Sequence, residues 1–300
     1  MKKMNVLNKT LAAAALALTM TTVFAASANL TQETFASPEA ASKALAAAAR
    51  ADDDKTLAQI LGSSEQQLSS GDAATDKAAL KDFVAKYERM NRWTVMTDGS
   101  RMLWIGADNY PFPIPLVSDG TAWHFDSATG EQEIALRRIG ANELLAIDAV
   151  YAIGSAEQAY RDGEAQEYAR LVLSSDGKHD GLYWNVVAND TPSPLATLGA
   201  IVTESSGLRE PLVLDGYTFR ILDAQGDDAI GGAKSYIKDG KMSEGFAVVA
   251  SPRDYGRTGV RSFMLSRDGV VYEKDLGDDT AEIAANIDEY NPGEGWTLIE

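Results

Sequence analysis

One histidine and one carboxylate are spaced so that they could act together in acid–base chemistry. His124 and Asp126 lie two positions apart in a segment that we predict to be a strand, so their side chains would share one face. A histidine beside a carboxylate can serve as a general base inside a pocket. The alternative, which we favour, is that Trp123 and Phe125 face the core and the polar pair faces water, because large apolar side chains usually set the buried face of a strand.

A polar turn contains the densest group of reactive and aromatic side chains. Its members follow one another closely along the chain: Lys178, His179, Asp180, Tyr183 and Trp184. Clusters of this kind on turns often form ligand-binding sites. Charged turns also serve simply to keep a protein soluble, and the sequence leaves both interpretations open.

Two adjacent arginines form a third candidate group. Arg137 and Arg138 could bind a carboxylate ligand, because a guanidinium group pairs with a carboxylate through two parallel hydrogen bonds. In so acidic a chain we favour internal ion pairs instead, with Glu131, Glu133 or Glu143 as the partner.

The composition excludes several reaction classes. The chain has no cysteine, which rules out disulfides, thiol catalysis and cysteine-ligated zinc. It has two histidines, so a multi-histidine metal site within one chain is nearly excluded. The Gly-x-Ser-x-Gly, Gly-x-Gly-x-x-Gly and phosphate-loop motifs are absent as well. We therefore predict neither a metal nor a cofactor.

The first 28 residues have the pattern of an export signal. Three lysines come first, an apolar run follows over 10–25, and the small residues 26–28 supply a cleavage site. The apolar run is shorter than the ~20 residues that a membrane-spanning helix needs. We expect a cleaved signal peptide over 1–28, a mature chain that begins near Asn29 in the periplasm or outside the cell, and no stable membrane insertion after cleavage.

The net charge restricts the partners. The chain carries a formal net charge of −17 at pH 7. Nucleic acids and anionic lipids are bound by neutralising phosphates with Lys and Arg, so a surface this negative repels both. We expect the partner to be an envelope protein or a small molecule, not a nucleic acid.

The apolar pattern predicts helices followed by strands, an α+β fold, in each of two domains over 29–150 and 151–300. Glycines at 154 and 163 weaken the helical pattern there, so we place a hinge or boundary near 150–165. Prolines alternate at 111, 113 and 115, which removes backbone donors from one side of a strand and predicts an edge strand. The expected helices cover 38–51, 53–61, 72–90, 130–138, 142–170, 193–203 and 279–290, and the expected strands 93–96, 102–105, 122–125, 217–222, 246–251, 260–266, 270–274 and 296–299.

Several of these segments carry a family resemblance. The chain resembles a bacterial family known as domain of unknown function 2950, in segments 35–41, 110–116, 123–126, 137–144, 176–184, 216–222 and 246–277. The family has no assigned activity, so the resemblance implies no functional residues.

Two further resemblances concern the fold. Residues 30–150 are similar to the nuclear-transport-factor-two-like (NTF2-like) superfamily, which implies a cone of helices around a curved antiparallel sheet. Residues 150–277 are similar to the head of type IV pilin-like proteins, which implies an antiparallel sheet with a long helix. Fold analogy alone does not establish function.

Two functional hypotheses follow. The first is an exported, non-enzymatic binding or envelope-assembly factor, and the sequence favours it over catalysis. The alternative is a small-molecule-binding or hydrolytic protein that uses a pocket in the N-terminal domain, with His124 and Asp126 as its acid–base pair. The direction of the His124 side chain distinguishes them, since catalysis requires it to point into a cavity near a carboxylate.

Overall fold

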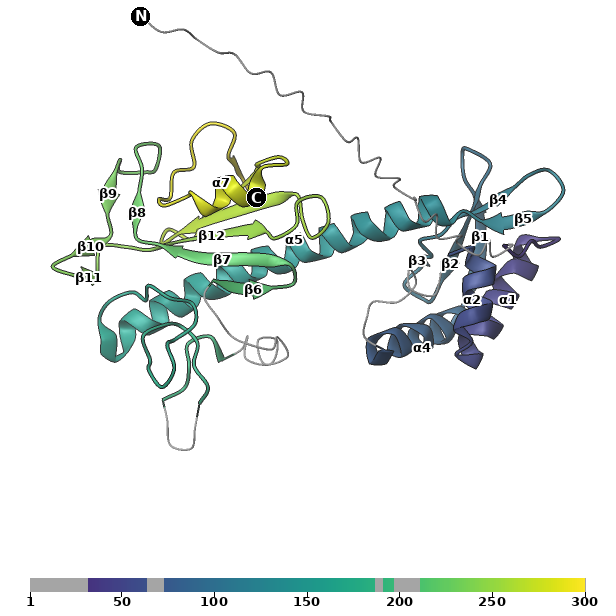
Figure 1. Cartoon of the computed structure of the whole chain (residues 1–300), viewed down its shortest axis with the longest axis horizontal. Helices are drawn as coiled ribbons and strands as arrows, with labels where there is room; N and C mark the ends of the chain where they lie inside the picture. Colours follow the sequence, from purple (N-terminus) through teal and green to yellow (C-terminus); the bar gives the residue numbers. More distant parts are fainter. Residues whose placement is uncertain (1–31, 64–72, 187–190, 197–210, 300) are drawn as a thin grey trace, which may run out of the picture. The chain divides into compact units, whose positions relative to one another are not determined.

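A computed structural model describes residues 32–63, 73–186, 191–196 and 211–299. Within it the chain forms two compact units (Figure 1). The N-terminal unit runs to Pro111 and includes Leu116–Phe125, and the C-terminal unit comprises Phe112–Pro115 and the chain from Asp126 onward. Both units contain helices and antiparallel strands, so the prediction of an α+β fold is confirmed. The predicted signal peptide lies outside the described residues.

The first two helices begin and end where capping chemistry predicts. The helix α1 (Pro38–Ala51) follows Ser37, whose hydroxyl accepts a hydrogen bond from the Ala40 N–H at 3.2 Å. The helix α2 (Asp54–Leu61) follows Asp53, whose carboxylate accepts from the Thr56 N–H at 3.0 Å. Both helices stop at a residue in the left-handed region, which closes the last turn.

The third described helix, α4 (Ala73–Arg89), is less buried than its pattern predicts. Tyr87 is buried, and its hydroxyl donates to Ser42 Oγ on α1 at 3.2 Å. The other members of the predicted apolar stripe are half-buried: Leu80, Phe83, Val84 and Met90. The α4 helix is therefore attached to the unit mainly through its C-terminal half.

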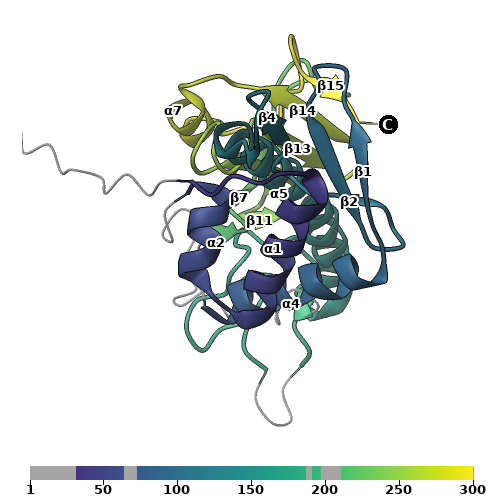
Figure 2. The same ribbon diagram turned by 90° about the vertical axis from the view of Figure 1, so that its right-hand side faces the viewer.

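The N-terminal sheet packs one face against these helices. Its strands are β1 (Asn91–Val95), β2 (Arg101–Ile105), β3 (Tyr110–Pro111), β4 (Leu116–Ser118) and β5 (Trp123–Phe125). The order is β1-β2-β4-β5, with β3 also paired to β2, and every pairing is antiparallel. Leu103, Leu116 and Phe125 are fully buried on the face that α1, α2 and α4 cover (Figure 2).

The proline-rich segment is an edge strand over only two residues. Tyr110 and Pro111 pair with β2, but residues 112–115 leave the sheet and join the C-terminal unit. Ile114 is buried there against Gly130, at a distance that leaves no room for a Cβ on the glycine. The prediction of an edge strand is confirmed over Tyr110 and Pro111 alone, since the chain then leaves the sheet, to which its prolines cannot donate, and buries Ile114.

One long helix replaces the two that were predicted after Asp126. The helix α5 (Ser127–Tyr160) contains 34 residues and continues into a π-helical turn, η1 (Arg161–Ala165). The regular backbone breaks at Gly163, with φ −80° and ψ −149°, and Gln166 has a positive φ. The break falls within the range expected for a hinge, whereas Gly154 lies inside the helix and the boundary expected at 150 falls within α5.

The C-terminal unit is a six-stranded antiparallel sheet. The order is β15-β14-β13-β12-β7-β6. Its strands are β6 (Leu212–Leu214), β7 (Tyr217–Leu222), β12 (Ala247–Pro252), β13 (Arg261–Ser266), β14 (Val271–Asp275) and β15 (Thr297–Leu298). Two small hairpins pair β8 (Ala224–Gln225) with β9 (Lys234–Ser235), and β10 (Ile237–Lys238) with β11 (Lys241–Met242). The strands predicted here are confirmed to within one or two residues at each end.

Helices lie on both sides of this sheet (Figure 1). The α5 helix packs against β12 and β13 through small and branched side chains: Ala146, Ala149, Val150, Ile153 and Ala156. The α7 helix (Thr280–Ala285) is shorter than predicted. Arg220 of β7 donates to the backbone carbonyls of Ala284 and Ile287, at 2.6 and 2.8 Å, and so binds the C-terminal end of α7 to the sheet. Most of the helix predicted at 193–203 lies outside the described residues.

No helix within the described ranges is long and apolar enough to cross a membrane.

Gly154 lets α5 approach β13 closely, and this contact can be tested. A Cβ at Gly154 would lie 2.9 Å from Leu265 Cδ2, whereas at Gly140, in the same helix, none of the described atoms lies within 4 Å. We expect Gly154→Leu to lower the free energy of unfolding by ~1–3 kcal/mol through overpacking. Gly140→Leu should leave it unchanged or raise it by up to ~1 kcal/mol, because leucine is the better helix former. Urea denaturation followed by circular dichroism measures both, and equal losses would contradict the packing argument.

Candidate functional site

The predicted turn cluster forms an exposed aromatic stack. The rings of His179 and Trp184 lie nearly parallel, with centroids 4.1 Å apart and planes 16° apart. His179 is exposed and Trp184 is half-buried. The indole N–H of Trp184 donates to the Thr191 carbonyl at 3.0 Å, which fixes the ring that carries the histidine. Lys178 directly precedes His179 in the sequence, and its side chain is exposed. We call Lys178, His179 and Trp184 the contact surface.

Asp180 closes the turn that carries the contact surface. Its two carboxylate oxygens accept from the N–H and the hydroxyl of Ser175, at 2.7 and 2.9 Å. The ammonium group of Lys178 lies 3.7 Å from one of these oxygens. Burial alone would raise the pKa of Asp180, but the bonds from Ser175 and the charge of Lys178 bring the pKa below its ordinary value. Asp180 therefore holds the turn as an ionised acceptor.

Tyr183 belongs to the core below the turn. It is 6 % exposed, and its backbone pairs with the preceding segment: its N–H donates to Val172 at 2.9 Å, and its carbonyl accepts from Ser174 at 2.8 Å. Its hydroxyl donates to Asn185 at 3.2 Å. Of the five residues predicted in this cluster, Tyr183 is thus a support for the exposed members.

His124 and Asp126 are placed differently from a catalytic pair. Asp126 is the N-cap of α5, and its two oxygens accept from the N–H and the hydroxyl of Thr129, at 3.1 and 2.7 Å. His124 is half-buried and pairs in register with Val117, on the sheet face opposite the buried Phe125. None of the hydrogen bonds or ion pairs found in the described part of the chain joins His124 to a carboxylate. The catalytic role stays a prediction without geometric support.

The arginine pair does not form a shared clamp. Arg137 Nε lies 2.7 Å from Glu133, one turn earlier on α5, which is one of the internal pairings that the sequence favoured. Arg138 is exposed. Glu143 binds elsewhere, because its Oε1 accepts from the N–H groups of Val260 and Arg261 at 2.9 and 3.0 Å. Glu143 therefore positions the start of β13.

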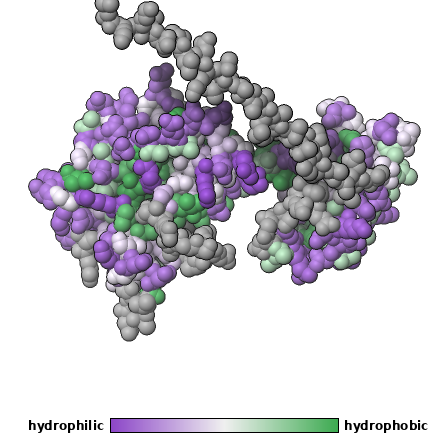
Figure 3. All heavy atoms as spheres, viewed as in Figure 1, coloured by the Kyte–Doolittle hydropathy of each residue, from purple (hydrophilic) through white to green (hydrophobic). Residues whose placement is uncertain are grey.

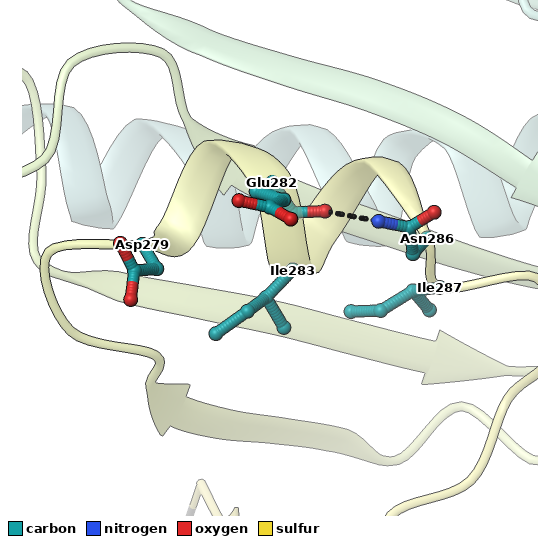
Figure 4. Close-up of a pocket in the computed structure, with 5 residues that line it drawn as sticks. All are labelled: Asp279, Glu282, Ile283, Asn286 and Ile287. Atoms are coloured by element: carbon teal, nitrogen blue, oxygen red, sulfur yellow. Dashed lines mark hydrogen bonds between the residues drawn. The ribbon is translucent and has the colours of Figure 1, made fainter.

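A shallow pocket lies along α7, away from all the predicted residues in sequence (Figure 4). It is lined by Asp279, Glu282, Ile283, Asn286 and Ile287, and the Asn286 amide donates to the Glu282 carbonyl at 2.8 Å. No group of three or more potential metal ligands occurs in the residues that the structure describes. The lining of the α7 pocket contains two carboxyl groups, from Asp279 and Glu282, and no histidine, lysine or arginine.

Sequence reasoning missed two titratable residues at the end of α5: the last residue of the helix, Tyr160, and one turn before it the acid Glu157. The side chain of Glu157 is fully buried on the inner face of α5. Burial raises the pKa of Glu157 to about 8, and the N–H of Ala169, which favours the charged form, offsets part of this effect. The sequence did contain an indication that Glu157 is buried, because its spacing places it on the helix face that also carries Val150 and Ile153.

The comparisons identify a family. The chain matches the family model described as "Protein of unknown function (DUF2950)" over residues 32–299, and it belongs to that family. Neither a search of curated proteins nor a search of solved structures found a match. The NTF2-like and pilin-head resemblances therefore stay predictions.

The role of Glu143 gives a prediction about stability. We expect Glu143→Ala to lower the free energy of unfolding of the C-terminal unit by ~1.5–3 kcal/mol, because two backbone N–H groups lose a charged acceptor. Glu133→Ala, in the same helix, removes a surface ion pair with Arg137 and should cost less than ~0.5 kcal/mol. Urea titrations of the two variants measure the difference, and similar losses would show that Glu143 does not position β13.

Proposed function

We propose that this protein is an exported, non-enzymatic binding or assembly factor of the bacterial envelope, and that it binds its partner through the contact surface. The amino-terminal pattern supports export. The exposed stack of His179 on Trp184 supports binding, and it is the observation on which the proposal depends.

The contact surface is organised before any partner arrives. Its anchoring bonds are internal: Trp184 to Thr191, Asp180 to Ser175, and the backbone pairing of Tyr183. A surface that is already ordered loses little conformational entropy on binding. Aromatic rings contribute strongly to such contacts because they bury a large area with few rotatable bonds.

The charge of the chain indicates what the partner presents. Hydrophilic side chains dominate the described surface drawn in Figure 3, and the formal net charge is −17. The contact surface contains an exposed lysine, next to His179 in the sequence, together with two stacked rings in this acidic setting. A protein partner that presents a carboxylate next to an apolar or planar side chain is complementary to that combination.

Export can be tested by fractionation. We expect the protein in the periplasmic or extracellular fraction, with a mature N-terminus near Asn29 in the mass spectrum. Leu16→Arg, which interrupts the apolar run, should leave the uncut form in the cytoplasm because the signal would no longer be recognised. Uncut wild-type protein in the cytoplasmic fraction would contradict export.

Binding can be tested with exposed residues alone. We expect the double variant Lys178→Ala/His179→Ala to recover at least about tenfold less partner than wild type after crosslinking in the envelope and mass spectrometry, as for loss of a binding hot spot. Lys238→Ala is a matched control, because the exposures of the lysine side chains are 67 % and 66 % and each has a nearby carboxylate. His124→Ala is a second control for loss of a histidine.

The controls also decide between the hypotheses. If Lys178→Ala/His179→Ala is folded by circular dichroism and recovers as much partner as wild type, the contact surface is not the binding site. Loss of recovery with His124→Ala instead would favour the N-terminal unit as the binding site.

A further inference from the structure

Glu157 is buried with half of its hydrogen-bonding capacity unused. Its exposed fraction is 0 %, and its Oε2 accepts from the backbone N–H of Ala169 at 2.9 Å. Its Oε1 is buried and has no hydrogen-bond partner among the described residues. A charged carboxylate in this position is costly, since desolvation is compensated by a single N–H group. The neutral acid is the form that the folded core favours.

The same helix end makes a second bond to the loop that follows it. Tyr160, the last residue of α5, donates its hydroxyl hydrogen to the backbone carbonyl of His179 at 2.9 Å. Glu157 thus binds the start of the loop at Ala169, and Tyr160 binds its tip within the contact surface. We call residues 169–184 the clamped loop, which lies beside the end of α5 (Figure 1).

The backbone between α5 and the clamped loop is where movement would occur. The break at Gly163 and the positive φ of Gln166 both lie between Glu157 and Ala169 in the chain. After this break in the chain, Tyr168 donates its N–H to the Met242 carbonyl at 2.8 Å. An opening of the loop would begin at this non-helical joint, and it would expose the buried Ala169, Val172 and Leu182.

We propose that the C-terminal turn of α5 is a pH-sensitive clamp, which holds the clamped loop through Glu157 and Tyr160 and releases it when Glu157 loses its proton. This regulation of the contact surface rests on the proposed function, although the clamp itself can be measured without a partner.

His179, in the clamped loop, is of the residue type that ordinarily changes charge between pH 5 and 8. Glu157→Gln leaves His179 in place, so a response that this variant abolishes belongs to Glu157. Burial, and then the charges of Glu167, Asp180 and Glu157, raise the pKa of Tyr160, so its hydroxyl keeps its proton. Arg161 donates to the Tyr168 hydroxyl at 3.0 Å. The strands packed against α5 carry few titratable side chains: none on β12, Arg261 on β13, and Tyr217 and Arg220 on β7, of which Arg220 binds α7.

The direction of the pH effect follows from linkage. The pKa of Glu157 is about 8 in the folded protein, above the ordinary value of 4.5 for a glutamate in water. The stabilisation of the closed loop is therefore fully present below pH 4.5 and decreases as the pH rises toward 8. Above pH 8, Glu157 is charged in the closed form as well, so a further rise in pH no longer changes the ratio of open to closed loop. Each pH unit between 4.5 and 8 changes this ratio by up to about tenfold.

Amide hydrogen exchange of the full mature chain tests the clamp. We expect the protection factors of the Ala169 amide and of the clamped loop, corrected for the intrinsic pH dependence of exchange, to fall by up to about a hundredfold between pH 5 and 7. Peptides from β12 and β13 should keep their protection, because the opening is local. Loss of protection in those strands in parallel would indicate global unfolding and overturn the proposal.

Neutral variants isolate Glu157. Glu157→Gln should keep the bond to the Ala169 N–H and give protection that does not depend on pH. Glu157→Met should also be independent of pH, but with an unprotected Ala169 amide, since the acceptor is lost. The matched control is Glu167→Gln, a partly exposed acid 3.9 Å from Lys241, which should retain the wild-type slope. A flat wild-type profile, or a wild-type slope in Glu157→Gln, would overturn the clamp.

Partner recovery separates the clamp from the proposed function. Wild type should recover less partner at pH 8 than at pH 6, and Glu157→Gln should recover equal amounts. If exchange shows the clamp while Lys178→Ala/His179→Ala still recovers the partner, the contact surface is wrong and the clamp stands. If the double variant loses the partner but exchange is flat, the clamp is wrong and the function stands.

Discussion

Close packing of α5 on the C-terminal sheet is the contact on which the rest of this unit depends. The inner face of the helix carries alanines, Val150 and Ile153, and Gly154 brings its backbone near Leu265. This approach buries Glu157 as well, because it lies one turn beyond Ile153 on the same face. Through Glu143 and Tyr160 the helix also fixes the start of β13 and the tip of the clamped loop. The helix thus positions both an interior strand of the sheet and the candidate site.

Local chemistry explains why much of the fold could be predicted from the sequence. Ser37 and Asp53 mark helix starts because their side chains bind the first free N–H groups. Partial alternation of apolar residues marks β7, and nearly continuous buried runs mark β12 and β13. The failures occurred where tertiary packing outweighed local preference. A glycine costs a helix ~1 kcal/mol, which predicted a break near Gly154, yet packing against Leu265 there requires a residue without a side chain. For Asp126 the sequence offered acid–base chemistry or, preferably, a position facing water, and neither alternative included its role as the N-cap of α5.

The candidate site also has a part that the sequence predicts and a part that it does not. Lys178, His179 and Trp184 could be grouped from the sequence because they lie on one turn, and the stack of the two rings needs only that proximity. Glu157 is distant from them in sequence. Its position on the apolar face of the helical pattern does not by itself show whether an acidic side chain is buried or exposed. Its proximity to Ala169 arises only when the chain turns back after Gly163. The residues of the turn were therefore predictable, and their anchor was not.

The two bonds from α5 and the internal bonds of the clamped loop have different consequences for the contact surface. The pairing of Tyr183 with Val172 and Ser174, and the bonds from Ser175 to Asp180, involve no atom of Glu157. Charging Glu157 keeps the bond from the Ala169 N–H but adds a desolvated charge to the closed state, which favours opening of the loop, and it leaves these internal bonds in place. The stack of His179 on Trp184 would then persist in a loop that is no longer held to α5. Regulation would act on the position of the contact surface, and a partner that requires contacts on both the loop and the helix end would respond most strongly.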